Sequence, residues 1–532
     1  MEKILSPFKN CSPRNFALDQ DRLAMKSAVE HIHRQLGMSY RLGDGQSKPE
    51  RENSIKYQAS LNPSNKKEVV GFVEFGDEKD LETAISQCDQ GRRSWGKTEA
   101  WERIQLVEAL ADWMQERRDI LSAWMVFEVG KNWREADADT CEAIDFCRYY
   151  AREMASLSKP IRMQELAGET NDLLYFPRGV FAVIAPWNFP LAILTGMTVA
   201  SLVAGNSVII KPAEQSSVIG AFLAQGLKEV GFPKDSFYFL PGEGEKLGPL
   251  LVSDPRVDGI CFTGSVEVGL SIIEGAAAKP KEGQRGVKKV IAEMGGKNAL
   301  IVDEDADLDE AVAGSIHSAF GFQGQKCSAL SRLIVHDRVY ESFVSRFVAA
   351  SKSLRTGPAW NPEFQVGPVV DDSSFRRIRR CIQDASSRLE VLYIGETDQD
   401  QGYFIPPAIF EVPDRSDTLF QNEVFGPVVA VHRVKSLDEA FEAVNSVRFA
   451  LTGGIYSRSP SHISRARKEM EVGNLYINRS ITGAIVGRQA FGGFKFSGVG
   501  SKAGGPDYLL QFLEPRLHTE NTVRRGFAAE EA

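Results

Sequence analysis

A cysteine beside a cation is the feature of this sequence with the clearest chemical potential. Cys327 lies in the segment 320–332 (FGFQGQKCSALSR), directly after Lys326, and Gly321 and Gly324 precede it. A nucleophilic cysteine needs access and an electrostatic environment that favours the thiolate, and an adjacent cation supplies such an environment. The two glycines allow backbone to come close. The alternative for any single cysteine is a buried thiol that packs as a small hydrophobe.

Two other segments support a chemical role for this cysteine. They are residues 185–190 (APWNFP) and 290–297 (VIAEMGGK), and both precede the cysteine segment. In this chain order the three segments resemble the aldehyde dehydrogenase superfamily, and the resemblance runs from about Asn62 to the C-terminus. It is closest to the branch that oxidises glutamate semialdehyde, the open form of pyrroline-5-carboxylate. Four segments carry that closer likeness: residues 324–328 (GQKCS), 482–489 (TGAIVGRQ), 501–508 (SKAGGPDY) and 524–526 (RRG).

Oxidation of an aldehyde to an acid requires a nucleophile, an oxyanion donor, a hydride acceptor and a base that activates water. The resemblance assigns nucleophilic attack to Cys327. It assigns the oxyanion to the Asn188 amide and the Cys327 backbone N–H, and one such donor lowers the barrier by about 3 kcal/mol. Glu293 would activate water as general base, so we expect a free acid as product. The alternatives are a turn residue before Pro190 for Asn188 and a capping or pairing role near Gly295 for Glu293.

A turn at Gly264 and Ser265 is a candidate phosphate site. It lies between an expected strand and an expected helix start in residues 262–269 (FTGSVEVG). Backbone N–H groups at such a turn can hold a pyrophosphate, although the spacing is not that of the Gly-x-Gly-x-x-Gly fingerprint and a plain turn is the alternative. Lys211 and Glu214 resemble the ribose-binding segment of the family. A carboxylate there would oppose a 2′-phosphate, which favours NAD over NADP; exposed surface side chains are the alternative.

The segment 423–427 (EVFGP) completes the expected cofactor site. In the resemblance Glu423 holds the nicotinamide ribose, and Trp187 and Phe425 join the cofactor-binding set. A solvated carboxylate near a turn is the alternative for Glu423.

The expected substrate carries an α-carboxylate and an α-ammonium at the end remote from its aldehyde. A carboxylate is best held by N–H and O–H donors. The resemblance assigns this task to Ser328 and to the backbone of Gly483 and Ala484. Phe189 and Phe491 would flank the aliphatic chain. The alternatives are an ordinary loop at residues 482–484 and a turn at residues 491–493.

Two further residues concern the width and charge of the substrate pocket. Asp137 is a weak candidate for the acidic surroundings of its mouth. Ile481 stands where the branch is expected to have a smaller polar residue, and such a change could alter the pocket width.

The elements that must position these residues follow an α/β pattern. Residues 80–155 have helical spacing of apolar side chains, and strands alternate with helices from residue 179 onwards, which predicts mostly parallel sheets covered by helices. We expect an aldehyde dehydrogenase-like fold with two parallel-sheet lobes, a Rossmann-like cofactor lobe and a catalytic lobe, plus a small oligomerisation ribbon. The expected division is an NAD-binding domain (1–160 and 179–294), a catalytic domain (295–498), and the ribbon with the C-terminal tail (161–178 and 499–532). The charged tail after His518 should be disordered unless a partner subunit orders it.

Composition excludes several other classes of protein. The 532-residue chain is 43% apolar and 25% charged, which is typical of a globular protein. A formal net charge of -8 with scattered basic residues opposes nucleic-acid binding. Seven widely spaced cysteines indicate a reduced intracellular protein with neither a disulfide framework nor a metal site. Polar residues interrupt the most apolar stretch, 191–210, so we expect no membrane span and a cytoplasmic location.

These features together predict an NAD-dependent dehydrogenase that converts glutamate semialdehyde to glutamate in proline breakdown. The chain is expected to form a homodimer or a higher homo-oligomer. It is too short to include a proline-oxidising domain, so a separate proline dehydrogenase should supply the substrate. One alternative is a dehydrogenase of another acidic semialdehyde. The other is a catalytically retired family member with a binding or structural role.

Overall fold

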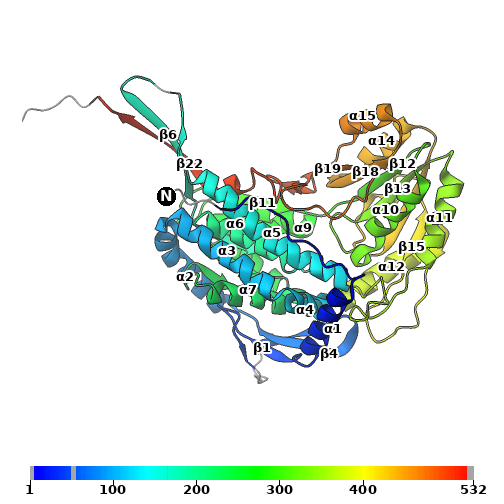
Figure 1. The fold of residues 1–532 in the computed structure, drawn as a ribbon, viewed down its shortest axis with the longest axis horizontal. Helices are drawn as coiled ribbons and strands as arrows, with labels where there is room; N and C mark the ends of the chain where they lie inside the picture. The colour runs from blue at the N-terminus through cyan, green and yellow to red at the C-terminus, as the bar shows by residue number, and fades with distance from the viewer. Residues whose placement is uncertain (1–4, 49–55, 165, 524–532) are drawn as a thin grey trace, which may run out of the picture.

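Two lobes and a projecting ribbon make up the computed structural model, which describes residues 5–48, 56–164 and 166–523 (Figure 1). The segment 524–526 of the expected branch signature lies outside these residues. The first lobe is built on a six-stranded sheet and the second on a seven-stranded sheet. This arrangement confirms the prediction of two parallel-sheet lobes.

The sheet of the first lobe has the order β21-β11-β10-β7-β8-β9 and is parallel except for β21. Its core strands are short apolar runs that are buried on both faces, as expected for parallel strands covered by helices. The strands are β7 (Val180–Ile184), β8 (Ser207–Lys211), β9 (Phe237–Phe239), β10 (Gly259–Thr263), β11 (Lys289–Glu293) and β21 (Gly498–Val499).

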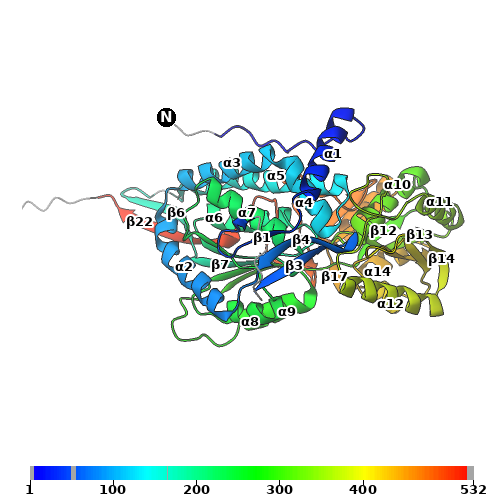
Figure 2. The same ribbon diagram turned by 90° about the horizontal axis from the view of Figure 1, so that it is seen from below.

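Helices cover both faces of this sheet (Figure 2). The helices in the crossovers are η1 (Glu214–Ser216), α6 (Ala192–Val203), α7 (Ser217–Glu229), α8 (Gly244–Ser253) and α9 (Val266–Ala276). The N-terminal half of the chain adds α1 (Asp19–His33), α2 (Glu78–Lys97), α3 (Ala100–Glu116), α4 (Arg118–Val129) and α5 (Trp133–Leu157). Local signals set their ends: Asp77 and Asp80 form a capping box at the start of α2, and Gly130 ends α4 in a left-handed conformation.

A small four-stranded sheet lies beside the first lobe, with the order β2-β1-β4-β3. Its strands are β1 (Met38–Tyr40), β2 (Ser47–Lys48), β3 (Tyr57–Asn62) and β4 (Asn65–Glu74).

The second lobe has the sheet order β14-β15-β16-β13-β12-β18-β19, in which only the edge strand β14 is antiparallel among the described strands. The strands are β12 (Asn298–Val302), β13 (Leu330–His336), β14 (Glu390–Ile394), β15 (Ala408–Glu411), β16 (Val428–Val434), β18 (Thr452–Tyr456) and β19 (Asn474–Ile477). The helical segments are α10 (Leu308–Phe320), η2 (Gly321–Gly324), α11 (Tyr340–Lys352), α12 (Asp372–Arg388), α13 (Thr418–Gln421), α14 (Leu437–Asn445) and α15 (Pro460–Glu469). β17 (Phe449–Ala450) and β20 (Phe494–Lys495) pair separately, and η3 (Leu509–Phe512) returns to the first lobe, where it packs into the core.

The projecting ribbon consists of β5 (Ile161–Arg162), β6 (Glu169–Pro177) and β22 (Leu513–Asn521) (Figure 1). β22 pairs antiparallel with β6 along its whole length, from Leu513 opposite Pro177 to Asn521 opposite Glu169. The expectation of a disordered tail after His518 is therefore wrong for residues 519–521. Backbone hydrogen bonds to β6 order this segment even though its side chains are polar and exposed.

No helix in the described ranges is long and apolar enough to cross a membrane. Within the same ranges, His, Cys, Asp and Glu side chains form no group that could hold a metal ion.

Candidate active site

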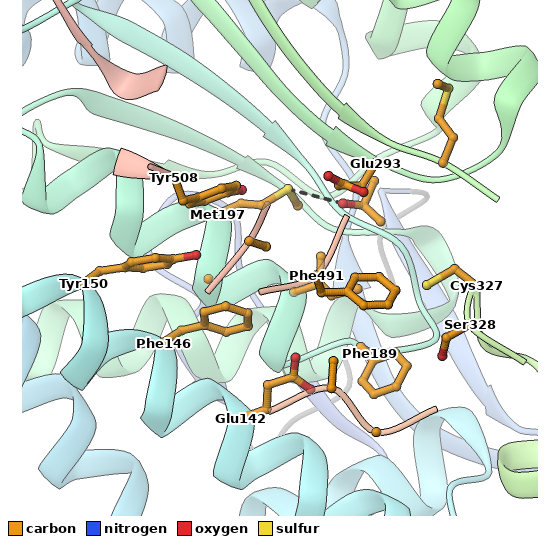
Figure 3. Close-up of a pocket in the computed structure, with 17 residues that line it drawn as sticks. Glu142, Phe146, Tyr150, Phe189, Met197, Glu293, Cys327, Ser328, Phe491 and Tyr508 are labelled. Carbon is orange, nitrogen blue, oxygen red and sulfur yellow. Dashed lines mark hydrogen bonds between the residues drawn. The ribbon is translucent and has the colours of Figure 1, made fainter. Parts of the chain in front are cut away.

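Cys327 lies where two cavities meet. It follows η2 and precedes β13, and its side chain lines both a narrow, mostly apolar cavity and a wider one. Thr263 and Met294 are the other two residues shared by the walls of these two cavities. Figure 3 shows the narrow cavity with Cys327 and Ser328 on one side and Glu293 above them. A molecule in either cavity can therefore reach the same sulfur atom.

The backbone just before Cys327 has an unusual conformation. Phe322, Gln323 and Gly324 have φ angles of 47°, 56° and 67°. Such left-handed conformations cost a non-glycine residue about 1–2 kcal/mol each, and here they are held by the Gln323 side chain, which donates to the carbonyl of Pro368 at 2.8 Å. A Cβ atom at Gly324 would lie 2.4 Å from the Gly426 carbonyl oxygen. The expected close backbone approach is thus confirmed at Gly324.

The prediction that Lys326 favours the thiolate of Cys327 is wrong. The Lys326 ammonium turns away and forms an ion pair with Glu135 at 2.7 Å. Burial, together with the carboxylates of Glu423, Glu293 and Glu142, raises the pKa of Cys327 to about 12. The resting side chain is therefore a neutral thiol at pH 7.

Glu293 ends β11 and enters the narrow cavity from the first lobe. Burial raises its pKa to about 8, although a backbone hydrogen bond from Gly493 and the charge of Lys502 act in the opposite direction. Its Oε2 atom is buried and has no hydrogen-bond partner among the described residues. Such a carboxyl group is suited to exchanging a proton with a water molecule near pH 8.

Two asparagines fix the groups around the sulfur atom. The Asn188 Nδ2 donates to the Gln325 carbonyl at 3.1 Å, which uses one of its two N–H groups, and Asn188 lines the wider cavity beside Cys327. Asn298 was missed in the sequence; its Nδ2 donates to the carbonyls of Cys327 at 2.7 Å and Ala329 at 2.9 Å. These bonds secure the cysteine loop from both ends.

The narrow cavity contains all five residues expected to bind substrate: Phe189, Ser328, Gly483, Ala484 and Phe491. Gly483 has a φ of 74°, and a Cβ atom added there would meet no other heavy atom within 4 Å. Its backbone therefore faces open space, as the close approach of a ligand requires. The Lys131 ammonium lies 3.9 Å from the centroid of the Phe189 ring and is paired with Asp139 at 2.9 Å, both fully buried. These contacts fix the ring from behind.

The cavity also contains an acid that sequence reasoning missed. Glu142 on α5 lines the wall with Phe146 and Tyr150, at intervals of four residues that place all three on one helix face (Figure 3). Burial, reinforced by the nearby Asp139, raises its pKa to about 8. The four-residue spacing was visible in the sequence, but nothing in it marked this face as the one that meets a cavity.

Two expectations about this cavity are wrong. Asp137 accepts two hydrogen bonds of 2.7 Å from the Arg118 guanidinium and does not line the cavity. Ile481 is fully buried in the core of the second lobe, where its Cγ2 atom packs against Gly454, and it does not line the cavity either. The Ile481 side chain therefore belongs to the lobe core and contributes no surface to the cavity.

The wider cavity has a volume of about 430 Å³ and contains five residues of the expected cofactor site. These residues are Trp187, Gly264, Ser265, Glu423 and Phe425. The Trp187 and Phe425 rings meet edge to face with centroids 5.6 Å apart. Glu423 accepts a hydrogen bond from the Gly296 N–H at 3.0 Å, and burial raises its pKa to about 7. Its interpretation as a solvated surface carboxylate is therefore wrong.

Ser265 is the N-cap of α9 and accepts a hydrogen bond from Val268 N–H. The expected strand, turn and helix start at this position are confirmed. Lys211 ends β8, two strands away in the same sheet, and its ammonium lies 3.8 Å from the Glu214 carboxylate at the start of η1. Glu214 also accepts from the Gly244 N–H at 2.5 Å. Both groups lie at the carboxyl ends of parallel strands, where α/β sheets bind ligands.

A family model described as "Aldehyde dehydrogenase family" matches residues 50–517. The chain belongs to the aldehyde dehydrogenase family. Among relatives of this aldehyde dehydrogenase, 1-pyrroline-5-carboxylate dehydrogenase of Geobacillus thermodenitrificans is 43% identical over 97% of this chain and 100% of its own. The enzyme of the same name from Bacillus subtilis is 41% identical over 95% of this chain and 98% of its own.

Solved structures give the same family. A 1-pyrroline-5-carboxylate dehydrogenase from Thermus with bound NAD has a TM-score of 0.94 at 42% identity, and the match covers 98% of this chain and all of that one. Proline utilization A from Bdellovibrio bacteriovorus has a TM-score of 0.95 at 48% identity. This aldehyde dehydrogenase spans only 55% of the length of that protein.

The residues of the wider cavity, together with Lys211 and Glu214 outside its wall, fit an NAD molecule. The N-terminus of α9 at Gly264 and Ser265 offers N–H groups to a pyrophosphate, and Lys211 and Glu214 offer a donor and an acceptor to ribose hydroxyls. Glu423 offers an acceptor close to Cys327. When bound, NAD supplies a hydride acceptor.

Proposed function

We propose that this aldehyde dehydrogenase oxidises L-glutamate γ-semialdehyde, which forms from 1-pyrroline-5-carboxylate, to L-glutamate with NAD as the hydride acceptor. The observation that carries the proposal is the narrow cavity, because the Cys327 thiol, the Glu293 carboxyl and the expected carboxylate-binding residues all line it. The relatives named 1-pyrroline-5-carboxylate dehydrogenase support the choice of substrate.

Because the resting group is a thiol, Cys327 first gives its proton to a water molecule in the proposed reaction. Its sulfur then adds to the aldehyde carbon. The second Asn188 N–H and the Cys327 backbone N–H hold the oxyanion that forms. Loss of hydride leaves a thioester on Cys327. Glu293, in its ionised form, removes a proton from water, and the resulting hydroxide displaces the sulfur and releases the acid.

The far end of the substrate carries two opposite charges, and the cavity has a group for each. The Ser328 hydroxyl and the N–H groups of Gly483 and Ala484 are the proposed partners of the α-carboxylate. Glu142 is the proposed partner of the α-ammonium, since an ionised carboxylate in an apolar cavity gains most from a cation. Phe189 and Phe491 enclose the methylene groups between the two ends.

The substrate assignment is tested by NADH formation with three aldehydes. We expect turnover of pyrroline-5-carboxylate to exceed that of succinate semialdehyde and of a simple aliphatic aldehyde in kcat/KM. Succinate semialdehyde has a carboxylate but lacks the ammonium group and one carbon, so the comparison tests recognition of the whole far end of the substrate. Faster turnover of either other aldehyde would contradict the assignment and leave the family chemistry intact.

Substitution of Glu142→Gln should raise the KM for pyrroline-5-carboxylate about 10-fold or more, because a charged hydrogen bond contributes about 1.5–3 kcal/mol. The KM for a simple aliphatic aldehyde should stay within about twofold. Steady-state kinetics with both substrates measure the difference. Glu153→Gln, on the same helix and outside the cavity wall, is the control. An equal rise of KM for both aldehydes would show that Glu142 has no role in binding the ammonium group.

Glu214→Gln should weaken discrimination between the two nicotinamide cofactors. Removal of its charge loses an acceptor for the ribose hydroxyls and relieves repulsion of a 2′-phosphate, so the KM for NAD should rise and that for NADP should fall. The ratio of kcat/KM for the two cofactors measures the change. Glu245→Gln, an exposed residue at the start of α8, should leave the ratio unaltered.

The proposal extends to organisation and context. The two parallel sheets support a division into an NAD-binding domain (1–160 and 179–294), a catalytic domain (295–498) and a ribbon with the tail (161–178 and 499–532). The ribbon has exposed Leu517 and Leu166 side chains, which supports its use as a subunit contact in a homo-oligomer.

A separate proline dehydrogenase would supply the substrate. This chain matches only 46% of the length of a bifunctional proline utilization A protein, which supports such a division of activities. The free cysteines support a cytoplasmic location.

A further inference from the structure

The N-terminal segment 6–14 runs along α5, and none of its residues lines the two cavities that the proposed reaction uses. The Arg152 Nε donates to the Ser6 carbonyl at 2.8 Å, the Cys11 N–H donates to Asp145 at 2.6 Å, and the Arg14 N–H donates to Asp137 at 2.8 Å. Figure 1 shows the same antiparallel course, in dark blue beside the cyan helix. Position 11 is therefore held against one defined stretch of α5.

Cys141 belongs to that stretch. Asp137, Cys141 and Asp145 follow each other at intervals of four residues, so they share one face of α5. The two carboxylates anchor the N-terminal segment on either side of Cys141. The Cys11 thiol donates to the Gln115 side-chain oxygen at 3.4 Å, and Cys141 is the neighbour with the largest effect on the pKa of Cys11. The backbone of both segments is thus fixed by other bonds, with Cys11 beside the stretch of α5 that carries Cys141.

The surroundings of Cys11 lower the pKa of its thiol. The Arg118 Nη1 lies 3.6 Å from the Cys11 sulfur, and the same guanidinium is held in place by two bonds to Asp137. The neighbouring Cys141 and the Arg118 charge lower the pKa of Cys11, against the opposing effects of burial, Asp145 and Asp137. The pKa of each of the other six cysteines, all of which lie in the described part of the chain, is raised.

Access also differs between the two sulfur atoms. Cys11 is partly exposed, whereas Cys141 is only 5% exposed. The more accessible thiol, which also has the lowered pKa, is the one that an oxidant attacks first, and a buried neighbour can resolve the product.

We propose that Cys11 and Cys141 form a redox-active dithiol that hydrogen peroxide closes to a disulfide, with Cys11 as the attacking and Cys141 as the resolving residue. The Cys11 thiolate attacks one peroxide oxygen, the O–O bond breaks, and the hydroxide that leaves is protonated to water. The Cys141 sulfur then attacks the sulfur of the Cys11 sulfenic acid and displaces its oxygen as a second water. The two thiols lose two electrons and two protons in total, and peroxide is reduced to two waters.

Such a bond would tie the N-terminal segment to the helix that supplies part of the substrate cavity. Glu142 directly follows Cys141, and it is the acid that lines that cavity. The dithiol itself is separate from Cys327, whose pKa is raised, so the two sites should differ in their rate of oxidation.

The test uses the full-length protein with a small molar excess of hydrogen peroxide, followed by alkylation of the remaining thiols and non-reducing digestion with trypsin. The expected product links the peptide of residues 10–14 to that of residues 135–148, and a thiol reductant abolishes it. The second peptide also contains Cys147, so fragment spectra must place the bond on Cys141. Recovery of Cys11 as a sulfinic acid or an alkylated thiol, with Cys141 free, would overturn the proposal.

Three variants sharpen the result. Cys141→Ser should trap Cys11 as a sulfenic acid that dimedone labels, and Cys11→Ser should leave Cys141 reduced at the same peroxide dose. Cys381→Ser is the matched control, because Cys381 is also partly exposed and should not affect the link. Thermal unfolding shows whether each variant is folded. If a variant is not folded, the disulfide peptide map of the unmodified chain decides the question. Failure of dimedone to label Cys11 in Cys141→Ser, at a peroxide dose that closes the link in the unmodified chain, would contradict the assignment.

Discussion

Replacement of Cys327 by alanine should abolish NADH formation from pyrroline-5-carboxylate, with a fall in kcat of at least about 10⁴-fold. Removal of a covalent nucleophile typically has an effect of this size or greater. No neighbouring thiol can replace it, since the other residues of the narrow cavity include no cysteine. Single-turnover experiments should show loss of the chemical step itself, and not only of steady-state turnover.

The control for Cys327→Ala must separate chemistry from folding and cofactor binding. Cys381→Ala removes a sulfur atom on α12, outside both cavities, and should retain full activity. NAD affinity, measured by calorimetry, should change little in Cys327→Ala because the Lys211, Glu214 and Glu423 groups are untouched. Retention of more than about one hundredth of the kcat in a folded variant would disprove the nucleophile assignment.

The second large effect is expected at Glu293. Glu293→Gln is close in size but has no base, so thioester formation should continue while its hydrolysis slows by about 10²–10⁴-fold. Rapid mixing should then show a burst of NADH equal to the number of active sites, followed by very slow turnover. The same variant should accumulate an acylated Cys327 that intact-mass spectrometry detects. A slow first turnover without a burst would instead place Glu293 before hydride transfer.

The pH dependence gives a second check on Glu293. Only the ionised form can act as base, and burial raises its pKa to about 8. In the unmodified chain the hydrolysis rate should therefore rise about tenfold per pH unit below pH 8 and level off above it. In Glu293→Gln this dependence should disappear from the hydrolysis step.

The same shift affects the stability of the fold with a defined sign. Between the unfolded pKa of about 4.3 and the folded pKa of about 8, the folded chain binds more protons at Glu293 than the unfolded chain. The contribution of this group to the free energy of unfolding therefore falls as the pH rises through this window. Urea unfolding at pH 5 and pH 8 should show a smaller loss of stability in Glu293→Gln than in the unmodified chain. Both proteins keep Glu142 and Glu423, whose pKa values are also raised, so some loss should remain in the variant.

Much of the fold could be predicted because buried parallel strands have a simple pattern. The strand at Ser207–Lys211 has three consecutive apolar residues at its centre. The strands β7 and β10 of the same sheet are also rich in apolar residues, and helices separate the strands in the chain. The reacting groups followed from segments whose order is typical of the family. Cys327, Glu293 and Asn188 all lie beside the shared walls of two cavities, although their roles stay predictions until tested.

The predictions that proved wrong concern side chains whose contacts are with residues far away in the sequence. Lys326 is next to Cys327 in the chain, yet its ammonium pairs with Glu135, which lies 191 residues earlier. Asp137 was a plausible mouth residue, but Arg118 binds it. Ile481 was close to the substrate segment, but its side chain turns into the lobe core. Sequence proximity gives no information about such three-dimensional choices.

The C-terminal part of the chain has a consequence for how the protein is made. β21 adds the last strand to the first sheet, Tyr508 lines the narrow cavity beside Tyr150, and β22 pairs with β6, which begins more than 340 residues earlier. Contacts of such long sequence separation slow folding, and a chain emerging from the ribosome forms its N-terminal parts first. The first lobe therefore remains open along one sheet edge until almost the whole polypeptide has been synthesised. During that interval the nascent chain has an unpaired strand that chaperones would need to shield.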